Sequence, residues 1–437
     1  MPTDSLTSSH PLPMNAWLDQ TLGPLMGWCL LVAAAAIVGH LVFRWSGFPR
    51  MLGYTLVGLL AGWLGVGDLA WPLVGNPLLL LQAALGTSLL IAATQVSLRW
   101  LLRQPMLLVQ SLAESLAALV LVTGGLQLLG MGWAVSLGVG VVAMAASPAV
   151  LLRVAADLRA AGAVTDRSLL LATLSAAYAL LLCLVLTVAW QPGEGAAEQA
   201  SLSLTAVGLG YLLWSLGLSV LWAVLAAAAL WPVLRWQSSR SDTTALYMLA
   251  VLVAVSLLAT RCGGSAVLGF VVAGLLLRNL SPKPLVWPAA FTAANTMLNL
   301  LMFVLVASMA AQVAPGWGLV VAVGVATVAR LVGKLGGVLL LGAGIGTGIG
   351  WRRQWAIACA QSPSSGLALA LASGLVLQWG SANAGVAGTV SAIALPMVVV
   401  SEVVGVLLAS LALWRSGEAH RGIGPAALAA KEKRHDA

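Results

Sequence analysis

Charged residues are scarce in this chain of 437 residues, and the scarcity limits what kind of protein it can be. Only 8% of the residues are Asp, Glu, Lys or Arg, whereas 60% are hydrophobic. A soluble protein keeps roughly a quarter of its residues charged. So little polar surface cannot cover so large an apolar interior in water. The sequence therefore predicts a protein whose main solvent is the lipid bilayer.

Cysteine is also rare, and the residue clusters of enzymes are missing. The four cysteines lie far apart without a CxxC pair, so we expect neither a disulfide framework nor a zinc site. No catalytic triad, metal cluster or phosphate loop is present, so we expect no enzyme activity and no cofactor. The glycine run from Gly342 to Gly350 follows a membrane helix and lacks the Lys-Ser/Thr pair of a phosphate loop. We therefore expect no nucleotide-binding domain.

Long hydrophobic stretches are the main feature that is present. A helix that spans a bilayer needs about 20 mostly apolar residues, and helices are expected because backbone groups in lipid must be satisfied internally. We predict an all-α polytopic membrane protein with thirteen spanning helices, over residues 23–43, 50–66, 76–97, 106–130, 132–155, 168–190, 202–233, 244–261, 264–280, 288–312, 317–342, 354–377 and 386–413. The expected organisation is a periplasmic segment over residues 1–22, a membrane domain over 23–413 and a short basic cytoplasmic tail over 414–437.

Basic residues predict the orientation in the membrane. Of the 21 Lys and Arg residues, 18 fall in alternate loops and in the C-terminal tail, whereas the opposite loops hold only Arg261. Because cytoplasmic loops are enriched in Lys and Arg, we predict an external N-terminus and a cytoplasmic C-terminus in a bacterial-type inner membrane. The net charge of +8 has the same explanation, so no nucleic-acid partner is expected. The first twenty residues lack a basic region, so no cleavable signal peptide is expected either.

Four ionisable residues fall well inside the predicted helices, namely Glu114, Arg330, Lys334 and Glu402. Each costs at least about 2.5–3.5 kcal/mol at the centre of a membrane helix unless it is paired or hydrated. Arg330 and Lys334 are four residues apart and share one helix face. Two interpretations remain open: these residues are static ion pairs or extend toward the interface, or they belong to a transport site.

Proline interrupts two of the predicted helices at similar sequences. Ser147-Pro148 lies in the fifth helix and Ser362-Pro363-Ser364 in the twelfth. Proline opens a helix, and paired interruptions in matching halves of a chain indicate a transporter binding site near the bilayer midplane. The breaks are seven helices apart, so the halves run in opposite directions, as an inverted repeat requires. Ser147, Ser362 and Ser364 are therefore candidate binding residues, unless the prolines are simple kinks.

Small residues mark close helix contacts in two further helices. Gly53, Gly58 and Gly62 lie in the second helix, and four glycines from Gly263 to Gly274 surround the ninth. We expect them to serve packing, within the chain or at a dimer interface.

These segments resemble the cation:proton antiporter superfamily, whose members have a membrane domain of the sodium/hydrogen exchanger type. The similar segments run from Phe48 to Gly62, Ala146 to Arg153, Ser265 to Gly274, Ala329 to Gly337, Ser362 to Leu367 and Ser401 to Gly405. The resemblance implies a dimerisation domain of helices 1–3 and 8–10, and a core domain, about residues 106–190 and 317–413, in which two broken helices cross. It also implies a homodimer that exchanges protons for sodium or potassium by an elevator movement of the core.

One residue of the family pattern is missing. The family carries its ion on an aspartate in the sixth helix, where this chain has Ser175-Ala176, and no acidic residue occurs between Asp166 and Glu194. Alanine can neither bind a cation nor release a proton. Lys334 matches the family's basic partner and is expected to lack its acid, in which case it could bind and release protons itself. Alternatively Glu114 or Glu402 replaces the aspartate, or both have a structural role.

Three functions remain open. The first is monovalent cation:proton antiport that depends on Lys334 and one of the glutamates. The second is transport of another solute, for instance an anion, because Lys334, Arg330 and serines without an acid suit an anion better than a cation. The third is a membrane partner or sensor that has lost transport.

Overall fold

The computed structural model describes residues 14–65, 73, 75–189, 206–236, 242–281, 285–314, 316–344, 350–364, 366–380 and 383–420. Every regular element within these ranges is a helix, so the predicted all-α class is confirmed. The helices are α1 (Met14–Ser46), α2 (Met51–Trp63), α3 (Asn76–Ala93), α4 (Leu98–Arg103), α5 (Pro105–Leu128), α6 (Trp133–Met144), α7 (Pro148–Asp157), α8 (Ala163–Ala189), α9 (Ala206–Trp236), α10 (Asp242–Cys262), α11 (Ala266–Leu280), α12 (Ala289–Ala311), α13 (Trp317–Gly344), α14 (Trp351–Ala360), α15 (Gly366–Gly380) and α16 (Ala384–Arg415).

The helices follow the predicted hydrophobic stretches. Nine segments in the described ranges are long and apolar enough to cross a membrane, and four shorter apolar helices accompany them. Each of the thirteen predicted stretches overlaps one of these segments, and the twelfth, residues 354–377, corresponds to α14 and α15 together. The number of membrane crossings itself stays a prediction.

One additional helix and one helix boundary differ from the expectation. Helix α4 lies where a loop was expected, because a search for runs of about 20 apolar residues cannot detect a helix of 6 residues. Helix α1 begins at Met14 and so extends into the predicted N-terminal segment, since Ala16, Leu18 and Gln20 are good helix formers without being a long apolar run. Residues 1–13, 345–349 and 421–437 lie outside the described residues, and with them parts of the N-terminal segment, the glycine turn and the basic tail.

Both predicted proline breaks are present, and they lie against each other. Helix α6 ends at Met144, and after an extended segment α7 begins at Pro148, where the missing N–H removes no helical hydrogen bond. Helix α14 ends at Ala360, and α15 begins at Gly366. The backbone N–H of Ser147 donates to the carbonyl of Pro363 at 3.0 Å. The two interruptions therefore form one junction in the interior of the bundle.

Glycines set the closest helix contacts. A Cβ on Gly58 would lie 2.5 Å from the carbonyl oxygen of Val304 in α12, and one on Gly53 would lie 2.5 Å from the Cα of Gly39 in α1. Gly274 of α11 likewise faces Ala93 of α3. These glycines thus serve packing within the chain, which is one of the two expected roles.

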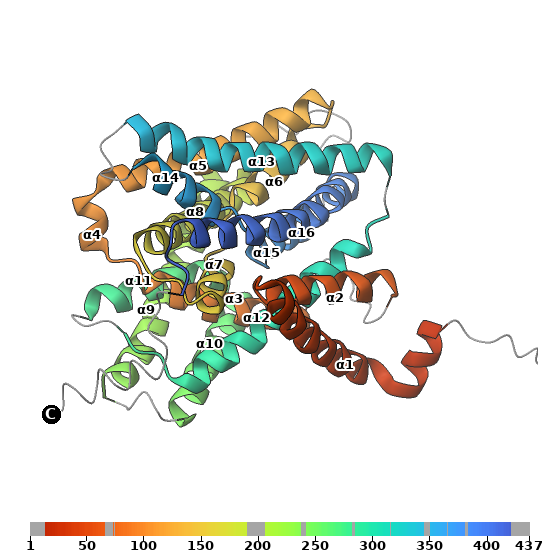
Figure 1. Cartoon of the computed structure of the whole chain (residues 1–437), viewed down its shortest axis with the longest axis horizontal. Coiled ribbons are helices and arrows are strands. Elements are labelled where there is room, and N and C mark those ends of the chain that lie inside the picture. The colour runs from red at the N-terminus through yellow and green to blue at the C-terminus, as the bar shows by residue number, and fades with distance from the viewer. Residues whose placement is uncertain are drawn as a thin grey trace, which may run out of the picture.

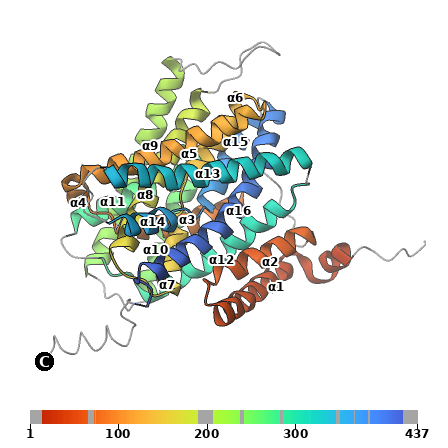
Figure 2. The same cartoon turned by 45° about the horizontal axis from the view of Figure 1, so that its top comes forward.

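The long helices α5 and α13 run side by side in both views (Figure 1 and Figure 2). In Figure 1 they lie along the top of the bundle, and α2 packs on α12 at the lower right. Helix α16 lies between them and also contacts α6, α14 and α15. The junction of the two broken helices lies against α13 and α16, since Arg330 of α13 bonds to Ala145 and Ser362, and Gly405 of α16 packs on Pro363.

Candidate functional site

A buried ion pair between α13 and α5 is the first element of the site. The Lys334 Nζ lies 2.8 Å from Oε2 of Glu114, and both side chains are 0% exposed. The expectation that Lys334 has lost its acid is therefore wrong. Of the two glutamates considered as replacements, the structure brings Glu114 to the lysine. Each charge offsets the cost of burying the other, which is large in the absence of a partner.

Hydroxyl groups connect this pair to Ser175 of α8, near which the family resemblance predicts an aspartate. The Lys334 Nζ also donates to the hydroxyl of Ser175 at 2.7 Å, and that hydroxyl donates to the carbonyl of Met144 at 2.8 Å. The hydroxyl of Ser115 lies 3.1 Å from Glu114 Oε1 and 3.1 Å from Ser175 Oγ, and it can donate to one of them at a time. A carboxylate from α5 thus lies beside the serine of α8, and the network ends at the last residue of the half-helix α6.

Two glycines of α13 allow this approach. A Cβ on Gly333 would lie 2.5 Å from the Cα of Ala118 in α5, and a Cβ on Gly337 would overlap the backbone of Glu114 itself. They are four residues apart and flank Lys334, so they form a small-xxx-small contact surface. The close packing of α13 on α5 therefore determines the distance between Lys334 and Glu114.

We expect Gly337→Ala to destabilise the protein by about 1–3 kcal/mol, because the added methyl group must push α13 away from α5. The same shift should separate Lys334 from Glu114. Gly336→Ala is the matched control, since nothing lies within 4 Å of its added Cβ. Thermal melting of the two variants in detergent measures the difference, and equal melting temperatures would contradict the contact.

Arg330 occupies the junction of the broken helices. Its Nε donates to the carbonyl of Ala143 at 2.9 Å, Nη2 to that of Ala145 at 3.0 Å, and Nη1 to that of Ser362 at 2.7 Å. The first two acceptors lie at the C-terminal end of α6 and the third follows the end of α14. A buried guanidinium thus satisfies carbonyls that both breaks leave without helical partners, and it lies at the negative ends of two helix dipoles.

The serines of the two breaks have different environments. The Ser147 hydroxyl accepts from the N–H of Val150 and caps α7. The Ser362 hydroxyl donates to the carbonyl of Cys359 at 2.7 Å. Ser364 is buried, and its hydroxyl has no partner among the described residues, nor has the amide of Gln361. Ser147 and Ser362 therefore belong to the junction through local and backbone bonds, and Ser364 adds an unused hydroxyl to it.

Glu402 of α16 lies in a separate contact. Its Oε1 accepts from the Thr55 hydroxyl of α2 at 2.7 Å, and its Oε2 has no partner among the described residues. Glu402 therefore links α16 to α2 rather than joining the charges around Lys334.

Sequence reasoning missed three groups of the site: the Ser115 hydroxyl, the Met144 carbonyl and the Thr55 hydroxyl. Ser115 follows the candidate residue Glu114 directly, so the sequence could have indicated it as a further site residue. A backbone carbonyl cannot be recognised as a ligand from a sequence. Thr55 is a single hydroxyl residue in the apolar helix α2, and no motif around it indicates a partner.

The fold and this site define a class of protein, a helical membrane transporter in which two broken helices meet beside buried charged side chains. The family model described as "Sodium/hydrogen exchanger, transmembrane" matches residues 31–414. The chain belongs to this family, which confirms the resemblance to the cation:proton antiporters.

Solved structures of one archaeal transporter share the fold. The structure of the sodium proton antiporter MjNhaP1 from Methanocaldococcus jannaschii at pH 8 is 15% identical with a TM-score of 0.61, and the match covers 92% of this chain and 99% of that one. An electron-microscopy map of MjNhaP1 is 16% identical with a TM-score of 0.63, covering 89% and 96%. No curated protein matches the chain significantly.

Proposed function

We propose that the chain exchanges protons for a monovalent cation, sodium or potassium, and that Glu114 supplies the carboxylate that Ser175-Ala176 lack. The observation that carries the proposal is the pair of Lys334 and Glu114, 2.8 Å apart and fully buried beside Ser175. The family and the antiporter described for the similar solved structures support the same reaction.

The charges of the pair allow a balanced exchange. With Lys334 protonated and Glu114 ionised, the pair is neutral. When a cation M⁺ binds the carboxylate, Lys334 releases one proton and becomes a neutral amine, so the site is neutral again. The hydroxyls of Ser115 and Ser175 and the carbonyl of Met144 offer further oxygen ligands, as hard cations require. One proton thus leaves for each cation that binds.

The anion alternative has less support from this geometry. Arg330 has all three of its nitrogens donating to backbone carbonyls, and Lys334 has a carboxylate as its partner. An anion at Lys334 would have to compete with the carboxylate of Glu114. A lysine whose charge is already compensated by a buried carboxylate suits the exchange of one cation for another better than the binding of an anion.

Movement of a core domain against a dimerisation domain is part of the proposal. The core comprises α5 to α8 and α13 to α16, and the dimerisation domain of a homodimer comprises α1 to α3 and α10 to α12. The hydrogen bond between Glu402 and Thr55 joins α16 to α2, so it would have to break or change partner as the core moves. The inner membrane and the external N-terminus remain predictions from the loop charges.

The proposal is tested by flux measurements on the full chain in liposomes that carry a pH gradient. Sodium or potassium should dissipate the gradient with the wild-type protein, and Glu114→Gln should reduce the rate to that of empty liposomes. Asp242→Asn is the matched control, because Asp242 is an exposed acid at the start of α10. Size-exclusion chromatography shows whether each variant is folded.

Three results would overturn the proposal. Dissipation by chloride or another anion alone would favour the anion transporter. No flux with any ion would favour a partner or sensor protein. An unchanged rate in folded Glu114→Gln would remove Glu114 from the exchange.

A further inference from the structure

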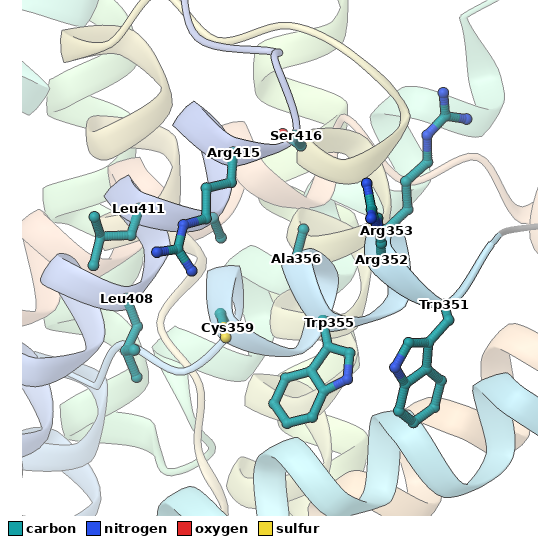
Figure 3. Close-up of a pocket in the computed structure, with 11 residues that line it drawn as sticks. Trp351, Arg352, Arg353, Trp355, Ala356, Cys359, Leu408, Leu411, Arg415 and Ser416 are labelled. Carbon is teal, nitrogen blue, oxygen red and sulfur yellow. The ribbon is translucent and has the colours of Figure 1, made fainter.

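A cavity of about 760 Å³ lies between α14 and α16, and none of the residues around Lys334 lines it (Figure 3). Its volume falls within the roughly 300–1,000 Å³ of small-molecule sites. The cavity borders the first turn of α14 on one side and the last turns of α16 on the other. It is therefore distinct from the buried network.

Arginines line the cavity from both helices (Figure 3). Arg352 and Arg353 come from the first turn of α14, Arg415 comes from the end of α16, and all three are exposed. None of the described residues that line the cavity is acidic. The first turn of α14 adds the positive end of the helix dipole, and its N-cap residue Gly350 has no side chain to occupy the free N–H groups. These charges suit an anionic group.

The rest of the lining is apolar and open. The indole rings of Trp351 and Trp355 contact each other edge to face with centroids 6.0 Å apart, and they are 53% and 42% exposed. Leu408 and Leu411 line the cavity from α16, on the other side of Cys359 from the indole rings (Figure 3). Tryptophan is enriched where a membrane protein meets the lipid headgroups. Such a surface can bind the hydrocarbon part of a ligand whose anionic group lies at the arginines.

We propose that this cavity binds an anionic phospholipid, with the phosphate at Arg352, Arg353 and Arg415 and the upper acyl chains along the tryptophans and leucines. A basic pocket between membrane helices is the expected form of such a site. Inorganic phosphate would use the arginines alone and leave the indole rings exposed to water.

A lipid in this cavity would contact both α14 and α16 close to the junction of the broken helices. Helix α14 ends at the second break, and Gly405 of α16 packs so closely on Pro363 that a Cβ would lie 2.5 Å from the proline Cα. Leu408 lies one helical turn after Gly405. A lipid between the two helices therefore holds the half-helix α14 against α16 beside the junction.

The test uses the full chain, stripped of lipid in a non-ionic detergent, and measures thermal melting while phosphatidylglycerol or phosphatidylcholine with the same acyl chains is added. Phosphatidylglycerol should raise the melting temperature saturably, by on the order of 5 °C, more than phosphatidylcholine does. Arg352→Gln, Arg353→Gln and Arg415→Gln combined should abolish the difference between the lipids. The single variant Arg415→Gln should reduce it if the combined variant fails to fold.

The matched control replaces three other exposed arginines, Arg44, Arg99 and Arg103, by glutamine. This variant loses the same charge and should keep the full effect of phosphatidylglycerol. Equal shifts with the two lipids would overturn the proposal, as would a full effect in the variants of the cavity arginines. An equal shift with sn-glycerol 3-phosphate would overturn the lipid assignment, because the acyl chains would then contribute nothing.

Discussion

Replacing Arg330 by methionine should cost the membrane domain on the order of 5 kcal/mol of unfolding free energy, because three buried carbonyls would lose their donor. The acceptors are the carbonyls of Ala143, Ala145 and Ser362. Each buried acceptor left unsatisfied costs about 1–3 kcal/mol, and a whole domain is stable by only about 5–15 kcal/mol. The variant should therefore be close to unfolding.

Two further variants make this test specific. Arg330→Lys keeps the charge but not the planar group that reaches three acceptors, so its loss should be intermediate. Arg261→Met removes an exposed arginine and should leave stability unchanged. Denaturant titration and thermal melting in detergent measure the losses. A melting temperature of Arg330→Met equal to that of Arg261→Met would show that the junction does not depend on this side chain.

The role of Arg330 also affects which backbone groups remain for an ion. A broken helix frees carbonyls that can bind cations, yet Arg330 already holds three of them. The carbonyl of Met144 instead accepts from Ser175, one hydrogen bond away from Lys334. The two basic residues of α13 thus have different partners, since Arg330 binds the carbonyls of the junction and Lys334 pairs with Glu114.

The sequence predicted features that depend on local patterns. Long apolar runs located the helices, and Pro148 and Pro363 located the breaks because proline removes a helical hydrogen bond wherever it occurs. The pairing of Lys334 with Glu114 could not be predicted. It depends on the register of α13 against α5, which Gly333 and Gly337 fix through contacts between segments far apart in the chain. The sequence offered Glu114 and Glu402 as alternatives for the missing carboxylate, and only the structure shows that Glu114 is the one that pairs with Lys334.

Replacing both members of the buried pair should restore stability without restoring transport. Glu114→Leu alone or Lys334→Met alone leaves an uncompensated charge, and each should cost about 3–5 kcal/mol. The combined variant contains no charge at this position, and apolar residues of similar volume replace buried ion pairs with little or no loss. Its unfolding free energy should therefore lie well above the value expected from adding the two single losses.

The double variant separates stability from exchange. Ser115 and Ser175 remain bonded to each other in it, so the surrounding network keeps its hydroxyl contact. If Glu114 and Lys334 carry the exchanged ions, this stable protein should show no cation-dependent dissipation of a pH gradient in liposomes. Additive single losses would show that the two charges do not stabilise each other in the bilayer. Exchange by the stable double variant would show that the pair holds α13 to α5 and that protons and cations cross elsewhere.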